Sequence, residues 1–329
     1  MKKIRAAIVG CGGIHHSHTS ALAEMEQVEI AAVCDVSIER AAATANKFGC
    51  IAFGDFESLL NYNEFDVLHI CTPHYLHADM AIAAMERGKH VLCEKPMSIS
   101  YVDALRVAET AERCGVKYGV CFQNRYNKST EFIRDLLLSG ELGAVKGARA
   151  FVTWDRDEGY YASGAWRGKI ATEGGGVLIN QAIHTLDLLQ WLVNKPVAGV
   201  KASVSTKRLY DFVETEDTAD LLLDFGEGVR GTFYATLCYA GNSPVFLEIL
   251  CENGKVTMAD DIRVCKSGAE DVCYNISHPA GEKAYWGTGH AMLIGDFYAA
   301  IEENRPFLID ARAAAVSIAI LEKAYQDAR

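Results

Sequence analysis

The sequence of 329 residues lacks the features of several specialised protein classes. No run approaches the roughly 20 apolar residues of a membrane span, and only 6 prolines are present, too few for a linker-dominated chain. None of the 11 cysteines forms a C-x-x-C pair, so a zinc ribbon or dithiol redox motif has no support. The net charge of −11 makes nucleic acid or an anionic membrane an unexpected partner.

The composition is that of an ordinary globular protein, with 50% hydrophobic and 23% charged residues. The basic start is followed by an apolar stretch too short for a signal-peptide core, so we expect a cytoplasmic protein. Several cysteines lie in apolar runs, and we expect them to be buried, reduced thiols.

Residues 1–122 alternate between apolar segments and helical patterns. Continuous apolar strands separated by amphipathic helices are typical of βαβ units, so this part predicts a Rossmann-type doubly wound parallel sheet. The predicted strands are 4–9, 28–34, 67–71, 90–93 and 117–122, and the predicted helices are 19–25, 38–48, 77–87 and 102–114.

Residues 123–329 follow a different pattern, which predicts a second, α+β domain with a largely antiparallel open sheet. Hairpin signals separate its strands, and helices are expected on one face of the sheet, with the closing helices free to pack back on the first domain. The predicted helices are 130–138, 177–193, 289–304 and 311–328, and the predicted strands are 144–154, 199–206, 218–225, 230–237 and 245–251.

A glycine-rich turn, Gly10-Cys11-Gly12-Gly13-Ile14, joins the first strand to a helix. Gly10 permits the tight turn and Gly12 lets the backbone approach a pyrophosphate, although His15 replaces the third glycine of the usual fingerprint. Asp35 ends the second strand, where a carboxylate can bond a ribose hydroxyl and repel a 2′-phosphate. We therefore expect NAD rather than NADP, with Arg40 as the residue that could reverse this preference. A purely structural glycine turn is the alternative.

Two further segments follow predicted strands: Thr72-Pro73 and Glu94-Lys95-Pro96. Ligands of parallel sheets bind at the carboxyl ends of the strands, so both segments are expected to line the cofactor crevice, with Lys95 projecting into it. The alternative for Lys95 is a solvated surface charge.

The predicted helix 177–193 carries Asn180 and His184, four residues apart and so on one face. Asp187 follows three residues later and is expected to orient the His184 imidazole. A histidine in a buried helix needs a hydrogen-bonding partner, so His184 is interpreted either as a satisfied core residue or as a catalytic one.

Taken together, four ordered marks resemble the Gfo/Idh/MocA oxidoreductases over essentially the whole chain. The marks are the glycine turn with His18, Thr72-Pro73 with His77, Glu94-Lys95-Pro96, and Gly174-Gly175-Gly176 with His184. The resemblance implies an NAD(P)-dependent dehydrogenase that moves a hydride between the nicotinamide and a secondary carbinol or ketone of a sugar, sugar derivative or cyclitol.

The same resemblance implies roles for individual residues. Lys95 would hold the reacting oxygen and His184 would be the acid/base, with the Lys95–Pro96 peptide often cis in such proteins. It also implies a homodimer or homotetramer formed through the C-terminal sheet. The implied cofactor-binding residues are Gly10, Gly12, Gly13, Ile14, Asp35, Thr72, Pro73, His77, Glu94 and Lys95. Two positions depart from the family pattern, since His74 replaces a common Asn and Asn180 replaces a common Asp.

The loop around residues 160–168 resembles the substrate side of sugar-acting members, because aromatic rings stack on sugars and guanidinium groups bond hydroxyls or carboxylates. The candidate substrate-binding residues are Tyr161, Trp166, Arg167, Asn180 and Arg125. Histidines 15, 16 and 18 lie too close together in one turn to make a convincing metal site, so none is expected. A non-catalytic nucleotide- or sugar-binding regulator on the same fold, and a reductase of a non-sugar substrate, are the alternative functions.

Overall fold

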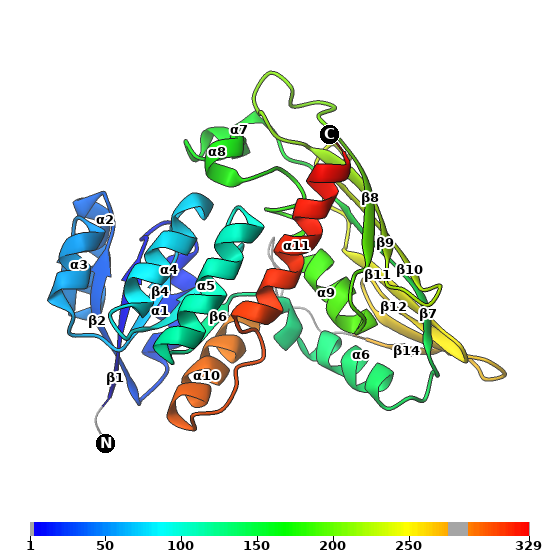
Figure 1. Cartoon of the computed structure of the whole chain (residues 1–329), viewed down its shortest axis with the longest axis horizontal. Coiled ribbons are helices and arrows are strands. Elements are labelled where there is room, and N and C mark those ends of the chain that lie inside the picture. Colours follow the sequence, from blue (N-terminus) through cyan, green and yellow to red (C-terminus); the bar gives the residue numbers. More distant parts are fainter. Residues whose placement is uncertain (1–2, 276–288, 329) are drawn as a thin grey trace. The chain divides into compact units, whose positions relative to one another are not determined.

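The computed structural model describes residues 3–275 and 289–328. The chain divides into two compact units, coloured along the sequence in Figure 1. Unit 1 comprises Met1–Gln123 with Gly289–Ala315, and unit 2 comprises Asn124–Thr288 with Val316–Arg329. Within the described ranges, no helix has both the length and the apolar character needed to cross a membrane.

Unit 1 is built on a six-stranded, all-parallel sheet, as the sequence predicts. The strand order is β3-β2-β1-β4-β5-β6, the order of dinucleotide-binding folds. Its strands are β1 (Ile4–Val9), β2 (Val28–Cys34), β3 (Ile51–Phe53), β4 (Val67–Ile70), β5 (His90–Cys93) and β6 (Tyr118–Val120). Its helices are α1 (His15–Ala23), α2 (Ile38–Phe48), α3 (Phe56–Tyr62), α4 (His77–Met85), α5 (Tyr101–Cys114) and α10 (Gly289–Glu302).

Local sequence signals set the helix ends of unit 1. The Ser37 hydroxyl accepts from the backbone N–H of Arg40 at the start of α2, and Ser100 does the same for Asp103 at the start of α5. Helices α2 and α5 end at Gly49 and Gly115, both left-handed, with φ of 67° and 66°. Strand β3 and helix α3 were not predicted from the sequence, because β3 has only three residues and no fully buried side chain.

The segment 289–315 completes unit 1 from the far end of the sequence. Helix α10 packs on α1, and the backbone N–H of Val120 in β6 donates to the Ile309 carbonyl at 3.1 Å. The Phe307 ring lies where a Cβ on Gly119 would be, with its Cε1 only 2.6 Å from that position. The edge strand of the nucleotide-type sheet is therefore closed by residues about 190 positions later in the chain.

Unit 2 is built on an eight-stranded sheet with the order β14-β13-β12-β11-β7-β10-β9-β8. All of its strand pairs are antiparallel except β10 with β7, which confirms the largely antiparallel sheet. Its strands are β7 (Val145–Thr153), β8 (Gly199–Ser205), β9 (Thr218–Asp224), β10 (Arg230–Thr236), β11 (Phe246–Cys251), β12 (Gly254–Met258), β13 (Ile262–Lys266) and β14 (Val272–Tyr274). Its helices are α6 (Lys128–Leu138), α7 (Glu158–Ala162), α8 (Ile170–Glu173) and α9 (Ile183–Val193), together with most of α11 (Ala311–Asp327).

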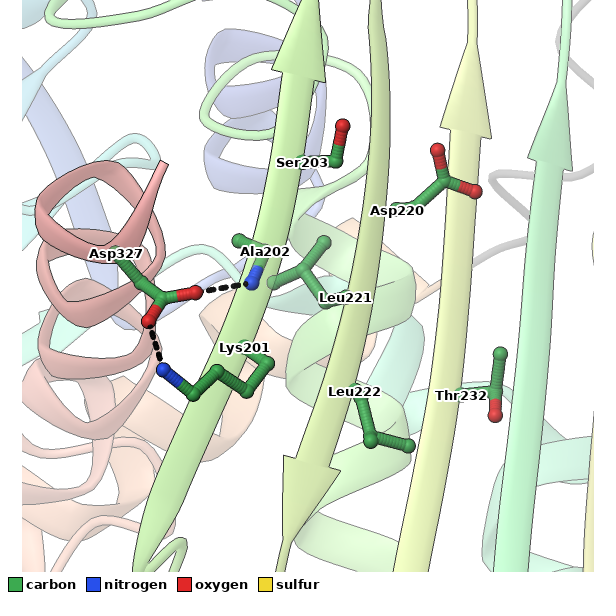
Figure 2. Close-up of a pocket in the computed structure, with 8 residues that line it drawn as sticks. All are labelled: Lys201, Ala202, Ser203, Asp220, Leu221, Leu222, Thr232 and Asp327. Carbon is green, nitrogen blue, oxygen red and sulfur yellow. Dashed lines mark hydrogen bonds and ion pairs between the residues drawn. The ribbon is translucent and has the colours of Figure 1, made fainter. Parts of the chain in front are cut away.

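The two faces of this sheet differ. Helix α9 packs on β7 and β11, and β9 turns Ala219, Leu221 and Leu223 into the buried side while Asp220 and Leu222 are exposed. The exposed side of β8–β10 has a shallow hollow of about 480 Å³ (Figure 2). At its edge, Asp327 of α11 accepts from the Lys201 ammonium at 2.5 Å and from the Ala202 backbone N–H at 2.9 Å.

Candidate active site

The carboxyl ends of four parallel strands in unit 1 lie at one edge of the sheet. Val9 pairs with Cys34 and with Ile70, and Ile70 pairs with Cys93. The residues that come directly after these four strands are therefore level with one another. They include Gly10, Asp35, Cys71 and Glu94, and this is the edge where parallel sheets bind ligands.

The glycine turn at this edge has the shape that the sequence predicts. Gly10 has a φ of 93°, and a Cβ there would lie 2.5 Å from the Cys71 carbonyl oxygen, so only glycine fits. Among the residues that the structure describes, nothing lies within 4 Å of a Cβ placed on Gly12 or Gly13. Ile14 is half-buried and leads into α1. This open backbone turn at a helix N-terminus fits a pyrophosphate.

Asp35 is buried next to this turn, and its carboxylate is already heavily bonded. It accepts from the backbone N–H of Cys11 at 2.8 Å and from that of Ser37 at 2.8 Å, and Arg40 Nη2 lies 2.6 Å from Oδ1. Burial raises the pKa of Asp35, but the bonds from Arg40, Ser37 and Cys11 outweigh it, so the net pKa is below the usual value. Arg40 thus neutralises the carboxylate that the sequence assigns to the ribose.

His77, which the family resemblance assigns to the cofactor site, links two loops through its two ring nitrogens. Its side chain is 1% exposed, with Nδ1 2.6 Å from the Pro96 carbonyl oxygen and Nε2 2.7 Å from that of Thr72. It therefore fixes the half-buried Thr72-Pro73 turn beside Lys95, which is also half-buried. The Lys95–Pro96 peptide is cis, as the family resemblance implies.

Glu94, which the family resemblance also assigns to the cofactor site, contacts two histidines. Its carboxylate is buried, and Oε1 lies within hydrogen-bond distance of His18 Nε2 (3.0 Å) and His290 Nε2 (3.2 Å). These three side chains come from three separate segments of unit 1. The sequence analysis had grouped His18 with His15 and His16 instead.

In unit 2, the segment before His184 is not helical, which corrects the helix predicted over 177–193. Helix α9 begins at Ile183, and residues 174–182 form turns. The buried carboxylate of Glu216 accepts from the backbone N–H groups of Gly176 (2.8 Å) and Leu178 (3.0 Å). These two hydrogen bonds stabilise the non-helical turns. Asn180 therefore does not share a helical face with His184, although both side chains are buried.

Asp187, which the spacing assigns to His184, has a partner that the spacing does not suggest. Both of its carboxylate oxygens bond to Arg125, with Nε–Oδ2 at 2.7 Å and Nη2–Oδ1 at 2.6 Å. Gln190 and Ser317 also donate to Oδ1. Arg125, which the sequence nominates for substrate binding, is buried and its guanidinium stacks on Trp191 at 5.1 Å, so it fixes α9.

A polar cluster forms around the Tyr160 hydroxyl. Arg167 Nη1, Gln181 Nε2 (2.9 Å) and Asn180 Nδ2 (3.3 Å) all donate to it, and the Arg167 guanidinium lies over the Tyr160 ring at 4.4 Å. Asn180 also donates to the buried Glu173 carboxylate at 2.5 Å. These five residues bring together Arg167 and Asn180, which the sequence had nominated, with three that it had not.

Trp166 and Tyr161 lie beside this cluster. The half-buried Trp166 ring lies 4.7 Å from the Arg167 guanidinium, so it extends the aromatic and cationic surface. Tyr161 is buried and packs edge-on against Tyr160 at 5.2 Å. Tyr161 thus supports the Tyr160 ring by packing against it.

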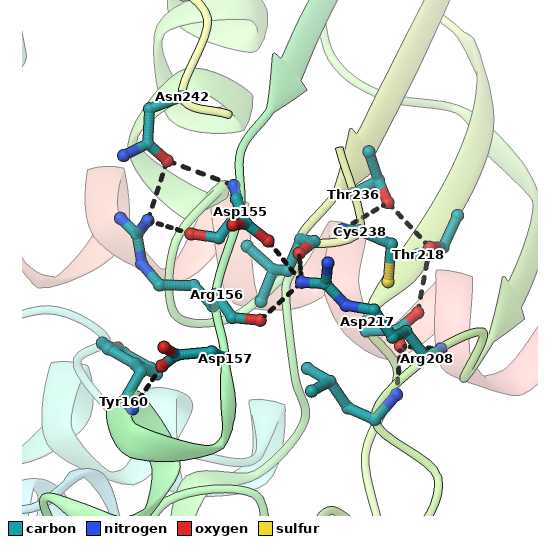
Figure 3. A network of polar contacts seen from close by, with 12 residues as sticks. Asp155, Arg156, Asp157, Tyr160, Arg208, Asp217, Thr218, Thr236, Cys238 and Asn242 are labelled. Carbon is teal, nitrogen blue, oxygen red and sulfur yellow. Dashed lines mark hydrogen bonds and ion pairs between the residues drawn. The ribbon is translucent and has the colours of Figure 1, made fainter. Parts of the chain in front are cut away.

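The loop that carries Tyr160 is anchored on both sides (Figure 3). Asp157 accepts from the backbone N–H of Tyr160 at 3.0 Å, and the Arg156 guanidinium lies over the Tyr160 ring at 5.5 Å. Arg208 Nη2 donates to the Arg156 carbonyl at 2.8 Å, and the backbone N–H of Arg208 donates to Asp217 at 2.9 Å. Burial raises the pKa of Asp217, but the bonds from three backbone N–H groups and a thiol outweigh this effect. The net pKa of Asp217 is therefore below its usual value.

Comparison with known proteins identifies the family. One family model, described as the NAD-binding Rossmann fold of the GFO_IDH_MocA oxidoreductase family, matches residues 4–122. A second, the GFO/IDH/MocA C-terminal domain, matches residues 130–257. The chain belongs to the GFO/IDH/MocA oxidoreductase family. This confirms both the fold class and the resemblance found in the sequence.

Individual relatives of this GFO/IDH/MocA chain are dehydrogenases. It is 29% identical to glucose-6-phosphate 3-dehydrogenase of Bacillus subtilis over 68% of this chain and 62% of that protein. It is 31% identical to inositol 2-dehydrogenase of Salmonella typhimurium over 60% of this chain and 57% of that protein. The matches thus span less than two thirds of these relatives' length.

Solved structures match over almost the full chain. The WlbA dehydrogenase from Bordetella pertussis, in complex with NADH and UDP-GlcNAcA, is 29% identical with a TM-score of 0.86, and the match covers 100% of this chain and 97% of that one. The similarity therefore extends over both units of the GFO/IDH/MocA chain.

Sequence reasoning missed two buried carboxylates of unit 2, Glu173 and Glu216. Each is surrounded by backbone N–H groups or amides from segments that are close in space, and no spacing rule marks such a residue. The available signals were the Gly174-Gly175-Gly176 run, whose Gly176 has no room for a Cβ against the Glu216 carbonyl oxygen, and the Glu216-Asp217 pair before a predicted strand.

Glu216 should make folding stability depend on pH. Burial raises its pKa to about 7, and the bonds from Leu178, Tyr325 and Gly176 only partly offset this. In the unfolded chain the carboxyl titrates near its ordinary value of 4.5, so between these two pH values the folded chain binds a proton that the unfolded chain lacks. The free energy of unfolding is then expected to fall as the pH rises from about 4.5 to about 7, by about 3 kcal/mol.

Urea unfolding of wild type and Glu216→Gln across this pH range measures the effect. The difference in unfolding free energy between the two proteins should change with pH, since glutamine does not titrate. Glu214→Gln, an exposed position two residues away, is the matched control and should leave the wild-type slope intact. A Glu216→Gln slope equal to that of wild type would contradict the assignment.

Proposed function

We propose that this chain is an NAD-dependent dehydrogenase acting on a secondary hydroxyl of a sugar, sugar derivative or cyclitol. The observation that carries the proposal is the donor-rich cluster around Tyr160 in a chain whose other unit has an NAD-binding Rossmann fold. Gln181 Oε1 and Arg167 Nε are buried there with no hydrogen-bond partner among the described residues. Buried polar atoms need partners, and a hydroxyl-rich ligand supplies them.

Donors from three residues, Arg167, Asn180 and Gln181, converge on the Tyr160 hydroxyl, and Asn180 also donates to Glu173. Guanidinium and amide donors of this kind are suited to hydroxyl or carboxylate oxygens of a substrate. Relatives named for glucose 6-phosphate and inositol, and a structural neighbour solved with UDP-GlcNAcA, agree with such a substrate class.

Lys95 and His184 are proposed as the catalytic pair. His184 takes the hydroxyl proton as general base, and the Lys95 ammonium stabilises the negative charge that develops on the oxygen. The Gly10–Ile14 turn and Asp35 would hold NAD⁺, which would supply the hydride acceptor. In the opposite direction the same two groups return a proton to a ketone oxygen. NAD is favoured over NADP because the matching family model describes an NAD-binding fold and a structural neighbour was solved with NADH.

A substrate panel tests this function. Sugars, cyclitols and nucleotide sugars are each mixed with the purified chain and NAD⁺ or NADP⁺, and absorbance of the reduced cofactor is followed. The expected result is turnover with at least one of them and a preference for NAD⁺. Saturable NAD⁺ binding in calorimetry without turnover on any compound would instead favour a nucleotide-binding regulator, and no binding of either cofactor would overturn the proposal.

We also propose a homodimer or homotetramer formed through the exposed face of the unit 2 sheet. Leu222 and Leu250 are each 47% exposed on that face, and exposed apolar sheet surfaces favour a twofold partner. Light scattering of wild type at micromolar concentration should give a dimer or larger, and the double variant Leu222→Asp with Leu250→Asp should shift it toward monomer. Val102→Asp, at an exposed position on α5, is the control. A monomeric wild type would contradict this assembly.

A cytoplasmic location is proposed on the state of the cysteines. All 11 are free thiols, including the exposed Cys273, and unpaired thiols persist in reducing compartments. Cell fractionation with the native chain tests this, and recovery outside the cytoplasm would contradict it.

A further inference from the structure

Three side chains in unit 1 converge on one point although they are far apart in sequence. His18 lies in α1, Glu94 follows β5, and His290 is in the first turn of α10. Glu94 Oε1 is 3.0 Å from His18 Nε2 and 3.2 Å from His290 Nε2, and the three ligand atoms all lie within 4.8 Å of one another. His18 is fully buried, and the side chains of Glu94 and His290 are 8% and 13% exposed.

This set of atoms matches the preference of zinc and similar divalent ions. Two imidazoles and one carboxylate are a common protein ligand set for Zn²⁺. With metal–ligand bonds of about 2.0–2.1 Å, the ligands of a tetrahedral ion lie about 3.3 Å apart, close to the two short distances seen here.

A buried thiol lies near the same ring nitrogen of His18 that faces Glu94. Cys121 Sγ, just beyond β6, is 3.9 Å from His18 Nε2. A thiol that binds zinc does so as the thiolate and releases its proton to solvent, and thiolate is a strong zinc ligand. A fourth ligand of this kind would close the coordination sphere, as is typical of structural rather than catalytic sites.

The surroundings of His18 hold its ring in the orientation that a metal ligand needs. His18 Nδ1 lies 2.8 Å from His69 Nδ1, and His69 Nε2 lies 2.9 Å from the Tyr298 hydroxyl. When His18 carries its proton on Nδ1 and donates it to His69, His69 can in turn donate from Nε2 to Tyr298. This arrangement satisfies both rings and leaves the lone pair of His18 Nε2 directed at the cluster, like the outer hydrogen bonds that support metal-bound histidines.

We propose that His18, Glu94 and His290 bind one divalent transition-metal ion of the zinc type, with Cys121 as the fourth ligand. The ion would tie α1, the end of β5 and α10 together directly beside Lys95. The sequence analysis expected no metal, because histidines 15, 16 and 18 are crowded in one turn. The structure separates them: His15 contacts Thr44 and Gly12, His16 is exposed, and His18 alone reaches Glu94 and His290.

Cobalt titration of the full-length chain tests the site. The protein is freed of any affinity tag, treated with a chelator and titrated with Co²⁺ under reducing conditions, and the visible spectrum is recorded. One equivalent should bind with the intense bands of tetrahedral Co²⁺, together with a near-ultraviolet thiolate charge-transfer band that is lost in Cys121→Ser. Zn²⁺ should displace the Co²⁺ and raise the thermal midpoint, since a ligand of the folded state stabilises it.

Matched variants separate this site from adventitious binding. Glu94→Gln and His290→Asn should each bind Co²⁺ at least about 100-fold more weakly, because a ligand is lost, whereas His16→Asn in the same helix as His18 should bind as wild type does. Circular dichroism checks that each variant is folded. If a variant fails to fold, the wild-type spectrum still decides. No saturable Co²⁺ band in wild type, or equal binding by all variants, would overturn the proposal and leave a hydrogen-bonded His–Glu–His cluster. These readouts do not depend on the dehydrogenase activity.

Discussion

Lys95→Met is expected to lower kcat on a verified substrate by about 10²–10³-fold, as does removal of one group that stabilises developing oxyanion charge in other enzymes. Methionine keeps the length of the side chain but has no charge to place near the reacting oxygen. NADH binding, followed by fluorescence, should persist, because the glycine turn and Asp35 are untouched. His184→Asn should lower kcat by about 10²–10⁴-fold, the usual contribution of a general base.

Lys47→Met serves as the control for Lys95→Met. Lys47 is an exposed lysine near the end of α2 in the same unit, and its loss should leave kcat unchanged. Near wild-type turnover by both Lys95→Met and His184→Asn would show that neither residue is catalytic.

Arg125→Met is expected to destabilise the chain by about 3–5 kcal/mol, because it leaves a buried carboxylate without its counter-charge. The side chains of Arg125 and Asp187 are 2% and 1% exposed, and two hydrogen bonds join them. The free energy of unfolding from urea titration measures the loss. The double variant Arg125→Met with Asp187→Leu should recover part of it, since the charge that was left unpaired is then absent.

Arg134→Met is the matched control for Arg125→Met. Arg134 lies over the same Trp191 ring, at 4.8 Å, but bonds the Trp191 carbonyl and Asn194 instead of a carboxylate. Its replacement leaves no buried charge unpaired and should cost clearly less. Equal losses for the two arginines would show that packing on Trp191, and not the ion pair, carries the stability.

The parallel sheet could be predicted from sequence because its information is local. Strands such as Ile4–Val9 and His90–Cys93 are continuous apolar runs, and their helices end at glycines. The same rule misread residues 177–182, where every side chain is buried and the apolar run looks like a helix. The backbone N–H groups of Val177 and Leu178 donate to the carbonyl and the carboxylate of Glu216, some 40 residues later, and no periodicity reports such a partner.

The sequence predicted those site residues whose role depends on their own backbone geometry. It did not predict the roles that depend on a partner distant in the sequence. Gly10 is required by its own positive φ and by close contact with Cys71, and the motif revealed it. By contrast, the interval of three residues between His184 and Asp187 suggested a contact, whereas both Asp187 oxygens bond to Arg125, 62 residues upstream. Which of several possible partners a buried charge takes is decided by the tertiary fold.

The closure of β6 by residues 307–309 has a consequence for synthesis of the chain in the cell. When residue 123 leaves the ribosome, Gly119 and Val120 still lack the ring and the carbonyl that cover them in the finished protein. At about 5–20 residues per second, translation takes roughly ten to forty seconds more to deliver these partners. The nucleotide-type unit is thus begun first and completed last, and during that interval a nascent chain with an unfinished sheet edge is a natural client for chaperones.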